Sequence, residues 1–405
     1  MIYSILYRVS LALATEHQEV NIIYFSIVLS IYMKEKNIRK SAKRYAKQKY
    51  LLAAINIAAG LAFLLFMALI ASKHLKNLLS LLITNECLLI ALYLIAFIII
   101  YEVITMPLSF YSGFILEHRF NLSNQFVLGW LKNEGKTLLL SLVIVIPVIE
   151  AIYFFLRNYP NIWWIFTGIL WLFLTVILTK FMPTLILPLF YKSVPIEDEK
   201  LKDKLLRLAE GAGINVEGIY RINLSKDTKK ANAALVGLGD TRRILLSDTL
   251  ISSFSHEEIE AVFAHELAHH IYHHTLKMLI VAGICGFAGF ALCYYILPVA
   301  IQLSLRAGGE AIPIHDIAAF PLLILVLSAF GFILLPLQNA YSRRLEKDCD
   351  IYSIEKTGNT AAFISMMNKL AEQNLADREP NKLIEILFYD HPPISKRIAL
   401  AERLK

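Results

Sequence analysis

Residues 255–275 read SHEEIEAVFAHELAHHIYHHT and contain the pattern His-Glu-x-x-His at 265–269. Ser255 and Glu258 have the S-x-x-E spacing of a capping box, which predicts that a helix begins at this point. Apolar residues then recur at the three- and four-residue intervals of one helix face: Ile259, Val262, Phe263 and Leu267. The stretch is therefore predicted to be a helix, and the rest of the chain can be read outward from it.

His265 and His269 are four residues apart, so on a helix both imidazoles can bind one metal ion. Glu266 points in a neighbouring direction, from which it can hold a metal-bound water and take its proton. Five-residue patterns also occur by chance, and a histidine-rich helix can simply be solvated. A zinc site needs a third protein ligand, which has to be sought elsewhere in the chain.

The composition indicates a membrane protein. Of the 405 residues 57% are hydrophobic, and several apolar runs exceed the roughly 18 residues that cross a bilayer. The net charge is +7, but the basic residues lie largely beside apolar runs. This placement favours orientation in a lipid bilayer over phosphate recognition, so no nucleic-acid partner is expected. The four cysteines have no paired close spacing, which argues against a disulfide framework.

A basic block at 34–50 sets the predicted topology. It carries eight Lys or Arg residues and one Glu, so the positive-inside rule places it in the cytosol. A short apolar piece at 20–33 is a possible first span. Six further candidate spans follow, at 51–71, 88–106, 138–156, 164–190, 276–298 and 319–337.

If the chain starts in the cytosol at residue 50 and crosses the membrane at each of the six later spans, three segments lie in the cytosol: 107–137, 191–275 and 338–405. We therefore expect an α-helical polytopic membrane protein with six or seven transmembrane helices and a cytosolic α+β zincin-like metalloprotease domain built from two chain segments. The membrane would be the ER in a eukaryote or the cytoplasmic membrane in a bacterium. The predicted parts are 1–190, an amino-terminal transmembrane region with cytosolic loops; 191–275, a catalytic segment; 276–337, a transmembrane hairpin; and 338–405, the second catalytic segment.

The hairpin at 276–337 predicts where the third ligand lies. It brings the chain back to the surface that it left after the His-Glu-x-x-His helix, so the ligand is expected soon after residue 337. The sequence there reads LQNAYSRRLEKDCDIYSIEKTG, with a helical pattern. Glu346 is the candidate ligand, and Asp350 one turn later can orient a ligand histidine. The alternative is a charged helix face that is only solvated.

Residues 191–255 are the only extended soluble α/β stretch of the sequence. A helix is predicted at 197–211, and strands at 217–222, 231–236 and 243–247, with a turn at Gly239-Asp240 between the last two. An edge strand beside the histidine helix can pair with an extended peptide through its backbone. Asn232 and Ala233 are the predicted substrate-binding residues of this strand, although a purely structural sheet fits the spacing equally well.

Several segments together resemble a known family. They are LSFYSGFILEHRFNLSNQ (108–125), LSKDTKKANAALVG (224–237), HELAHHIYHHTLK (265–277), SRRLEKDCD (342–350) and DHPPISKRI (390–398). These segments are similar to those of the type I CAAX prenyl endopeptidases, which are membrane-embedded zinc metalloproteases. The resemblance extends over nearly the whole chain from about residue 40.

The resemblance implies one Zn²⁺ per chain, bound by His265, His269 and Glu346. It further implies that His391 stabilises the tetrahedral intermediate and that Arg397 receives the carboxylate end of the substrate. The transmembrane helices would enclose a chamber for the prenyl and peptide parts of the substrate. That substrate would be a prenylated protein, from which the carboxyl-terminal tripeptide is removed.

The sequence departs from the family pattern near the metal motif. His273 stands where the family often has Gly, and Cys349 stands where it usually has a small residue such as Ala. We interpret Cys349 as a packed side chain rather than a thiolate ligand. His270 and His273 are interpreted as surface or supporting residues rather than ligands.

Two other functions remain compatible with parts of the sequence. A general quality-control protease could cleave other membrane-associated polypeptides without a prenyl requirement. A non-catalytic zinc-binding membrane protein would have no need of the general base, and Glu266 is present.

Overall fold

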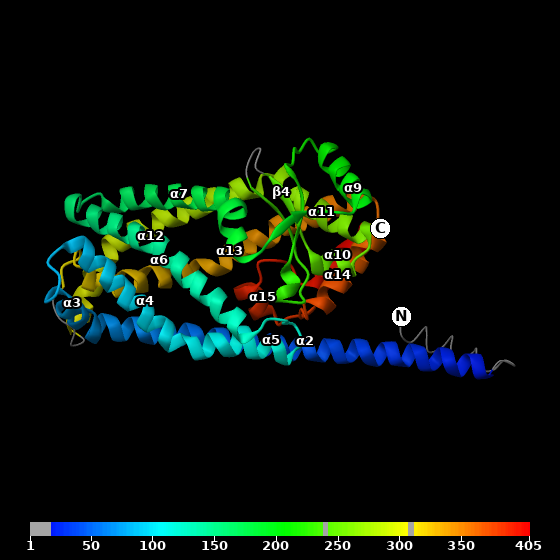
Figure 1. Cartoon of the computed structure of the whole chain (residues 1–405), viewed down its shortest axis with the longest axis horizontal. Coiled ribbons are helices and arrows are strands. Elements are labelled where there is room, and N and C mark those ends of the chain that lie inside the picture. Colours follow the sequence, from blue (N-terminus) through cyan, green and yellow to red (C-terminus); the bar gives the residue numbers. More distant parts are fainter. Residues whose placement is uncertain (1–17, 238–241, 307–311) are drawn as a thin grey trace.

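The computed structural model describes residues 18–237, 242–306 and 312–405. Long helices form an elongated bundle, and the sheet and shorter helices gather at one of its ends (Figure 1). The helices of this bundle are α2 (Gln18–Phe66), α3 (Ser72–Ser80), α4 (Glu86–Phe110), α6 (Val127–Asn158), α7 (Trp163–Phe181), α12 (His274–Arg306) and α13 (Phe320–Thr357).

Six helical stretches of the described chain are long and apolar enough to cross a membrane, as the sequence predicts. They are Glu35–Ser80, Glu86–Arg119, Val127–Asn158, Trp163–Phe190, His274–Arg306 and Ile317–Thr357. Three of them continue through single π-helical turns, which are Met67–Ala71, Tyr111–Ile115 and Met182–Ile186. The protein is therefore a multi-pass α-helical membrane protein.

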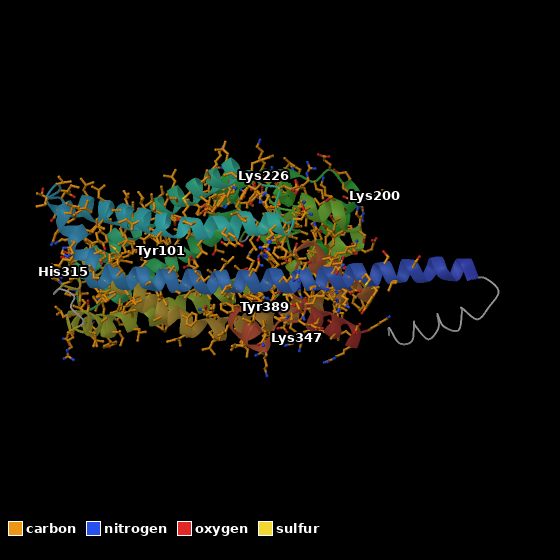
Figure 2. All side chains as sticks on the ribbon, turned by 90° about the horizontal axis from the view of Figure 1, so that it is seen from below. Tyr101, Lys200, Lys226, His315, Lys347 and Tyr389 are labelled. Carbon is orange, nitrogen blue, oxygen red and sulfur yellow. The ribbon has the colours of Figure 1, made fainter. Side chains whose placement is uncertain are left out.

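The predicted short span at 20–33 is not a separate crossing. It belongs to α2, a single helix of 49 residues that is about 74 Å long. This helix runs without a break through the basic block at 34–50 and extends beyond the rest of the molecule (Figures 1 and 2). A continuous helix of this length cannot turn back, so 20–33 and 51–66 cannot both cross the same bilayer. Residues 1–17 lie outside the described chain.

Glycines of α7 and α12 let these two helices approach closely. A Cβ atom on Gly168 of α7 would lie 2.4 Å from the Phe287 ring of α12, and one on Gly286 would lie 2.3 Å from the Trp171 ring. Large side chains of one helix thus pack directly on the backbone of the other, which is the usual packing of membrane helices.

A four-stranded sheet lies at the other end of the molecule from the α12–α13 turn. Its strands are β1 (Ser193–Pro195), β2 (Gly218–Ile222), β3 (Ala233–Val236) and β4 (Arg243–Ser247), in the order β1-β2-β4-β3. The pair β2–β4 is parallel and the other two pairs are antiparallel. The three predicted strands are found within two residues of their expected bounds. The predicted turn at Gly239-Asp240 lies outside the described residues.

Short helices surround this sheet: α5 (Leu116–Arg119), α8 (Leu187–Phe190), α9 (Glu199–Glu210), α10 (Asp248–Ser253), α11 (His256–Ile271), α14 (Thr360–Gln373), α15 (Lys382–Phe388) and α16 (Ile394–Arg403). Single 3₁₀ turns occur at Leu224–Lys226 and Ile317–Ala319. Apolar side chains of α9, the sheet, α11 and α14 share one hydrophobic core. This core holds the helix with the His-Glu-x-x-His pattern rigidly against the sheet.

The three segments predicted to share one side of the membrane lie at the same end of the bundle. Ser123, in the loop before α6, forms a β-bridge with Thr228, and Lys230 pairs with Glu117 of α5 at 2.8 Å. Helices α11 and α13 pack on each other, which joins the segments on either side of the hairpin. His315, between α12 and α13, lies at the opposite end (Figure 2).

The predicted capping box at the start of α11 is present. The Ser255 hydroxyl accepts from the Glu258 backbone N–H at 3.3 Å, and the Glu258 carboxylate accepts from the Ser255 backbone N–H at 2.7 Å. Glu258 also binds Lys369 Nζ at 2.7 Å and the Ser365 hydroxyl at 2.6 Å, both from α14. Burial raises the pKa of Glu258, but these contacts outweigh burial and lower it.

We predict that Glu258→Gln lowers the thermal unfolding temperature at neutral pH. The variant loses the ion pair with Lys369, whereas its amide oxygen can still accept from the Ser255 N–H, so the loss comes from the removed charge. Because the folded-state pKa of Glu258 is lowered, its contribution is full above the unfolded-state pKa of about 4.3 and is lost as the pH falls through the folded-state value. The difference between wild type and variant should therefore shrink on acidification.

The matched control is Glu199→Gln. Glu199 is well exposed and pairs with Lys202 within one helix, so its loss should change the unfolding temperature little. Equal destabilisation by the two substitutions would contradict the structural role of Glu258.

Candidate active site

Two helices supply the centre of the site. His265, Glu266 and His269 lie on α11, and Glu346 and Asp350 lie one turn apart on α13. The two helices pack side by side, and His265, Glu346 and Asp350 are buried between them. The structure thus brings the predicted third ligand next to both histidines.

The Glu346 carboxylate faces both imidazoles. Its Oε2 lies 3.1 Å from His265 Nε2, and its Oε1 lies 3.3 Å from His269 Nε2. Zinc bonds of 2.0–2.2 Å in a tetrahedral arrangement place neighbouring ligand atoms about 3.4 Å apart. Each imidazole therefore lies from the Glu346 carboxylate at about the spacing of neighbouring zinc ligands.

Asp350 contacts His265 in the position that its predicted orienting role requires. Its Oδ1 lies 3.0 Å from His265 Nδ1, which leaves Nε2 of that ring free to bind a metal. Burial lowers the pKa of His265, but the hydrogen bonds to Asp350 and Glu346 raise it to about 9. The surroundings of this imidazole therefore favour positive charge, which is what a bound cation supplies.

Arg397 of α16 binds the same aspartate. Its Nε donates to Asp350 Oδ2 at 2.8 Å, and its Nη2 donates to Oδ1. The guanidinium is almost fully buried and neutralises a carboxylate that has no exposure to solvent. The structure thus gives Arg397 a supporting contact that the sequence did not indicate, and its role toward a substrate carboxylate stays a prediction.

His391 also reaches the centre. Its Nε2 lies 3.3 Å from Glu346 Oε2, and its Nδ1 pairs with Asp390 at 2.8 Å. Burial lowers the pKa of His391, but Asp390 and Glu346 outweigh burial and raise it. About half of the ring is exposed, so it can meet a substrate. Asp390 is a site residue that the sequence analysis missed, because adjacency alone does not show that two side chains pair.

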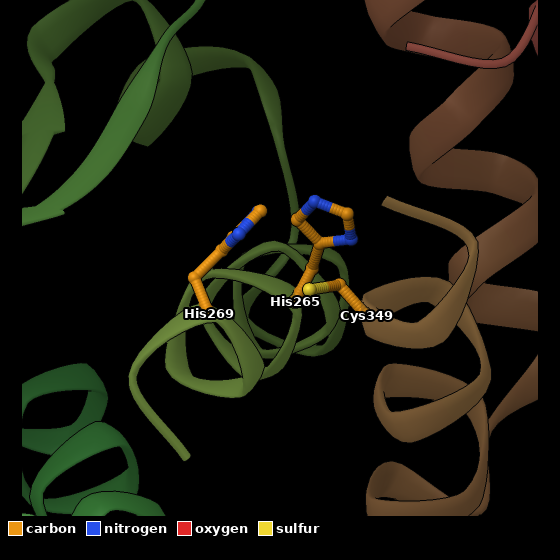
Figure 3. A group of neighbouring side chains, drawn as sticks. All are labelled: His265, His269 and Cys349. Atoms are coloured by element: carbon orange, nitrogen blue, oxygen red, sulfur yellow. The ribbon is translucent and has the colours of Figure 1, made fainter. Parts of the chain in front are cut away.

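Cys349 and His274 lie behind His269. The Cys349 sulfur is 3.4 Å from His274 Nδ1, which in turn is 3.1 Å from His269 Nδ1. Figure 3 shows Cys349 projecting from α13 toward α11 beside the two histidines.

Cys349 is an alternative third ligand on distance alone. His265, His269 and Cys349 each offer one ligand atom, and these three atoms all lie within 4.8 Å of one another. The Glu346 oxygens lie 3.1 and 3.3 Å from the two Nε2 atoms, which is close to the spacing of neighbouring ligands in a tetrahedral site. Glu346 therefore stays the predicted ligand, and Cys349 stays the predicted packed side chain.

Strand β3 is an edge strand of the sheet, which is the placement that substrate pairing requires. The Asn232 backbone accepts from the Ser247 N–H and donates to the Ser247 hydroxyl, both at 3.0 Å, so it faces β4. The Asn232 side chain is exposed, and Ala233 follows it on the opposite edge. His270 is buried and donates from Nε2 to the Leu235 carbonyl at 2.9 Å, which links α11 to this strand.

A His-Glu-x-x-His helix, a glutamate from a second helix and six membrane-spanning helices together define an integral-membrane metalloendopeptidase. Residues 195–405 match Peptidase family M48, and residues 22–192 match the family described as "CAAX prenyl protease N-terminal, five membrane helices". The chain belongs to peptidase family M48. Within 22–192 the described residues contain four of the six candidate spans.

Proteins of known sequence and structure agree with this assignment. The chain is 28% identical to the "Uncharacterized metalloprotease YhfN" of Bacillus subtilis, over 89% of this chain and 85% of that protein. It is 31% identical to CAAX prenyl protease 1 of Saccharomyces cerevisiae, over 73% of this chain and 68% of the yeast protein. The crystal structure of S. mikatae Ste24p has the same fold, with a TM-score of 0.80 and 23% identity over 90% of this chain and 89% of that one.

We predict that Glu346→Ala abolishes tight metal binding, because two imidazoles alone remain. Asp350→Asn should retain the metal with about 10–100-fold weaker affinity, since the ligand His265 loses its orienting partner. Metal content after dialysis and competition with a chelator measure both effects.

Two substitutions on the same helix serve as controls. Asp348→Asn is exposed and should bind metal like wild type. Cys349→Ala should also retain the metal; loss of metal in Cys349→Ala with retention in Glu346→Ala would instead identify the thiol as the ligand.

Proposed function

We propose that this protein is a zinc endopeptidase that cleaves membrane-associated polypeptides, with a prenylated CAAX protein as its substrate. The observation that carries the proposal is the convergence of His265, His269 and Glu346. The Glu346 carboxylate oxygens lie 3.1 Å from His265 Nε2 and 3.3 Å from His269 Nε2. Two imidazoles and one carboxylate form the ligand set of a catalytic zinc site with an open position. Zinc bound there would lower the pKa of a water and polarise the scissile carbonyl.

The protein's own groups supply the remaining chemistry. Glu266 lies beside His265, is only partly buried, and takes the proton of the attacking water before passing it to the leaving amine. His391 donates to the oxygen on which negative charge develops, a contribution on the order of 3 kcal/mol. Asp390 holds that imidazole in place and favours its protonated form.

Two features support a substrate with both a peptide and a lipid part. Strand β3 offers an edge for an extended peptide beside α11. A largely apolar cavity of about 830 Å³ lies between α2, α4 and α13, with Phe63, Tyr101 and Phe332 in its wall. The relatives named CAAX prenyl protease 1 favour a prenyl group as the lipid part.

The second candidate is a general membrane protease without a prenyl requirement. The Bacillus subtilis relative, which is similar over most of both chains, is named only as a metalloprotease. The catalytic mechanism would be the same, and only the source of binding energy would differ.

We propose that the catalytic segments lie on the cytosolic side. The basic block at 34–50 is at the end of the bundle that holds the sheet: Lys49 is 3.4 Å from Glu117, and Tyr45 of the same block bonds the Lys230 ammonium at 2.9 Å. Under the positive-inside rule this end faces the cytosol.

We predict that purified wild type contains about one zinc per chain and cleaves a farnesylated CaaX peptide, whereas Glu266→Gln binds zinc but is inactive. The amide of the variant cannot accept the proton of the water, so the chemical step is lost while the ligands remain. Metal analysis and mass spectrometry of the products measure the two effects, with the matched unprenylated peptide as the comparison.

Each outcome of this experiment distinguishes the alternatives. Cleavage of only the farnesylated peptide supports a prenyl protease, and comparable cleavage of both peptides supports general membrane proteolysis. Equal activity of Glu266→Gln and wild type, or a wild type without bound metal, would overturn the metallopeptidase mechanism itself.

We also predict a pH effect at Asp390. Asp390 raises the pKa of His391, and the protonated imidazole is the donor, so activity is lost as the pH rises through that pKa. Asp390→Asn should move the alkaline limb of kcat/KM to lower pH, whereas His391→Asn should remove this limb and lower the rate at all pH values. An unchanged alkaline limb in both variants would contradict the role of His391.

A further inference from the structure

The segment 229–235 has an alternating pattern of backbone contacts. The carbonyl of Lys230 accepts from the Thr249 hydroxyl at 2.8 Å, and the Asn232 backbone bonds Ser247, so the even-numbered residues face β4 and α10. Because successive residues of an extended chain point their backbone groups to opposite sides, the odd-numbered residues face the open edge. These are the groups that a substrate strand would have to use.

Most of these edge groups are already bonded to the protein. The Lys229 N–H donates to the Leu122 carbonyl at 2.9 Å. The Ala231 N–H donates to Asn374 Oδ1 at 2.9 Å, and the Ala231 carbonyl accepts from Asn374 Nδ2 at 3.2 Å. At the other end of the strand, the Leu235 carbonyl accepts from His270.

Ala233 remains between these closures. In the parts of the chain that the structure describes, it is the one odd-numbered residue of 229–235 for which no backbone hydrogen bond is recorded on this edge. Asn374 caps α14, and His270 is buried on α11 directly after His269, so both closing side chains are held by packed helices. Among the described residues, the open part of this edge is therefore Ala233 together with the N–H of Leu235.

Such a short opening limits what pairing with β3 can contribute to binding. Backbone pairing adds affinity with each hydrogen bond, so a peptide that pairs at Ala233 alone gains little from this edge. The antiparallel arrangement is the more stable one. In it, the substrate residues that follow the pairing residue run toward Ala231, where Asn374 and then Leu122 occupy the edge.

We propose, on the basis of the function proposed above, that Asn374 and His270 are specificity-determining residues that close the edge strand on both sides of Ala233. Asn374 restricts the residues after the scissile bond, so the site favours bonds close to a free carboxyl terminus. His270 restricts pairing of the residues before it, so the substrate needs a second anchor, such as an attached lipid, for its affinity.

Two sets of peptides test the two closures separately. The first set is farnesylated and carries three, six or nine residues after the scissile bond. The second set lacks the lipid and carries an increasing number of residues before the bond. The readout is kcat/KM within each set, with zinc content and unfolding temperature measured for every variant.

Wild type should favour three residues after the bond. Asn374→Ala should raise the relative kcat/KM for nine residues by about tenfold, since it exposes two backbone groups to the substrate. His270→Leu should instead raise the rate on long unlipidated peptides, whereas His270→Gln, which keeps a donor for the Leu235 carbonyl, should resemble wild type. Glu372→Gln, on the exposed side of α14, is the matched control and should leave both profiles unchanged.

Length profiles that are the same in wild type, Asn374→Ala and His270→Leu would overturn the proposal, provided that zinc content and folding are retained. If Asn374→Ala changed the profile for residues before the bond and His270→Leu the profile for residues after it, the peptide would not pair antiparallel to β3. The inference about carboxyl termini would then be wrong as well. A wild type that cleaves none of the peptides would contradict the proposed function, which is a separate result.

Discussion

A buried charge cluster between α11 and α13 is the constraint on which the rest of the arrangement depends. Asp350 is fully buried and Glu346 nearly so, and isolated carboxylates in such surroundings would be strongly destabilising. They are stable here because His265 and Arg397 contact Asp350 while His265, His269 and His391 contact Glu346. These contacts fix α11, the loop before α16 and α16 itself around α13. A bound metal ion would add positive charge, which the two carboxylates favour.

The membrane helices determine which segments can meet in this cluster. Helix α12 leaves directly after α11, and α13 returns to the same end of the bundle with Glu346 and Asp350 in its last part. The hairpin of α12 and α13 therefore brings α11 and the last part of α13, which hold the two halves of the candidate site, to the same end of the bundle. Substitutions within the bundle that alter the rise or tilt of α12 or α13 should act on the proposed metal site, although they lie far from it.

The open edge of strand β3 is surrounded in the same way by segments that lie far apart in the chain. The loop before α6 pairs with residues 227–229, α14 supplies Asn374, and α11 supplies His270. Strand β3 is therefore positioned by the membrane region, by the carboxyl-terminal region and by α11 at once. This arrangement links the geometry of the proposed peptide-binding edge to that of the proposed metal ligands.

The sequence by itself determined the local features: the capped helix with His265 and His269, the six spans, the strands, and Glu346 as the candidate third ligand. These follow from short-range patterns and from the rule that a membrane hairpin returns to the side it left. The continuity of α2 through 20–33 was missed, because an apolar run does not show whether a helix breaks after it. The pairing of Arg397 with Asp350, of Asn374 with Ala231 and of His270 with Leu235 appeared only in the tertiary structure. Such contacts join residues separated by 35 or more positions, and only the packing of α11, α13, α14 and α16 brings those residues within hydrogen-bonding distance.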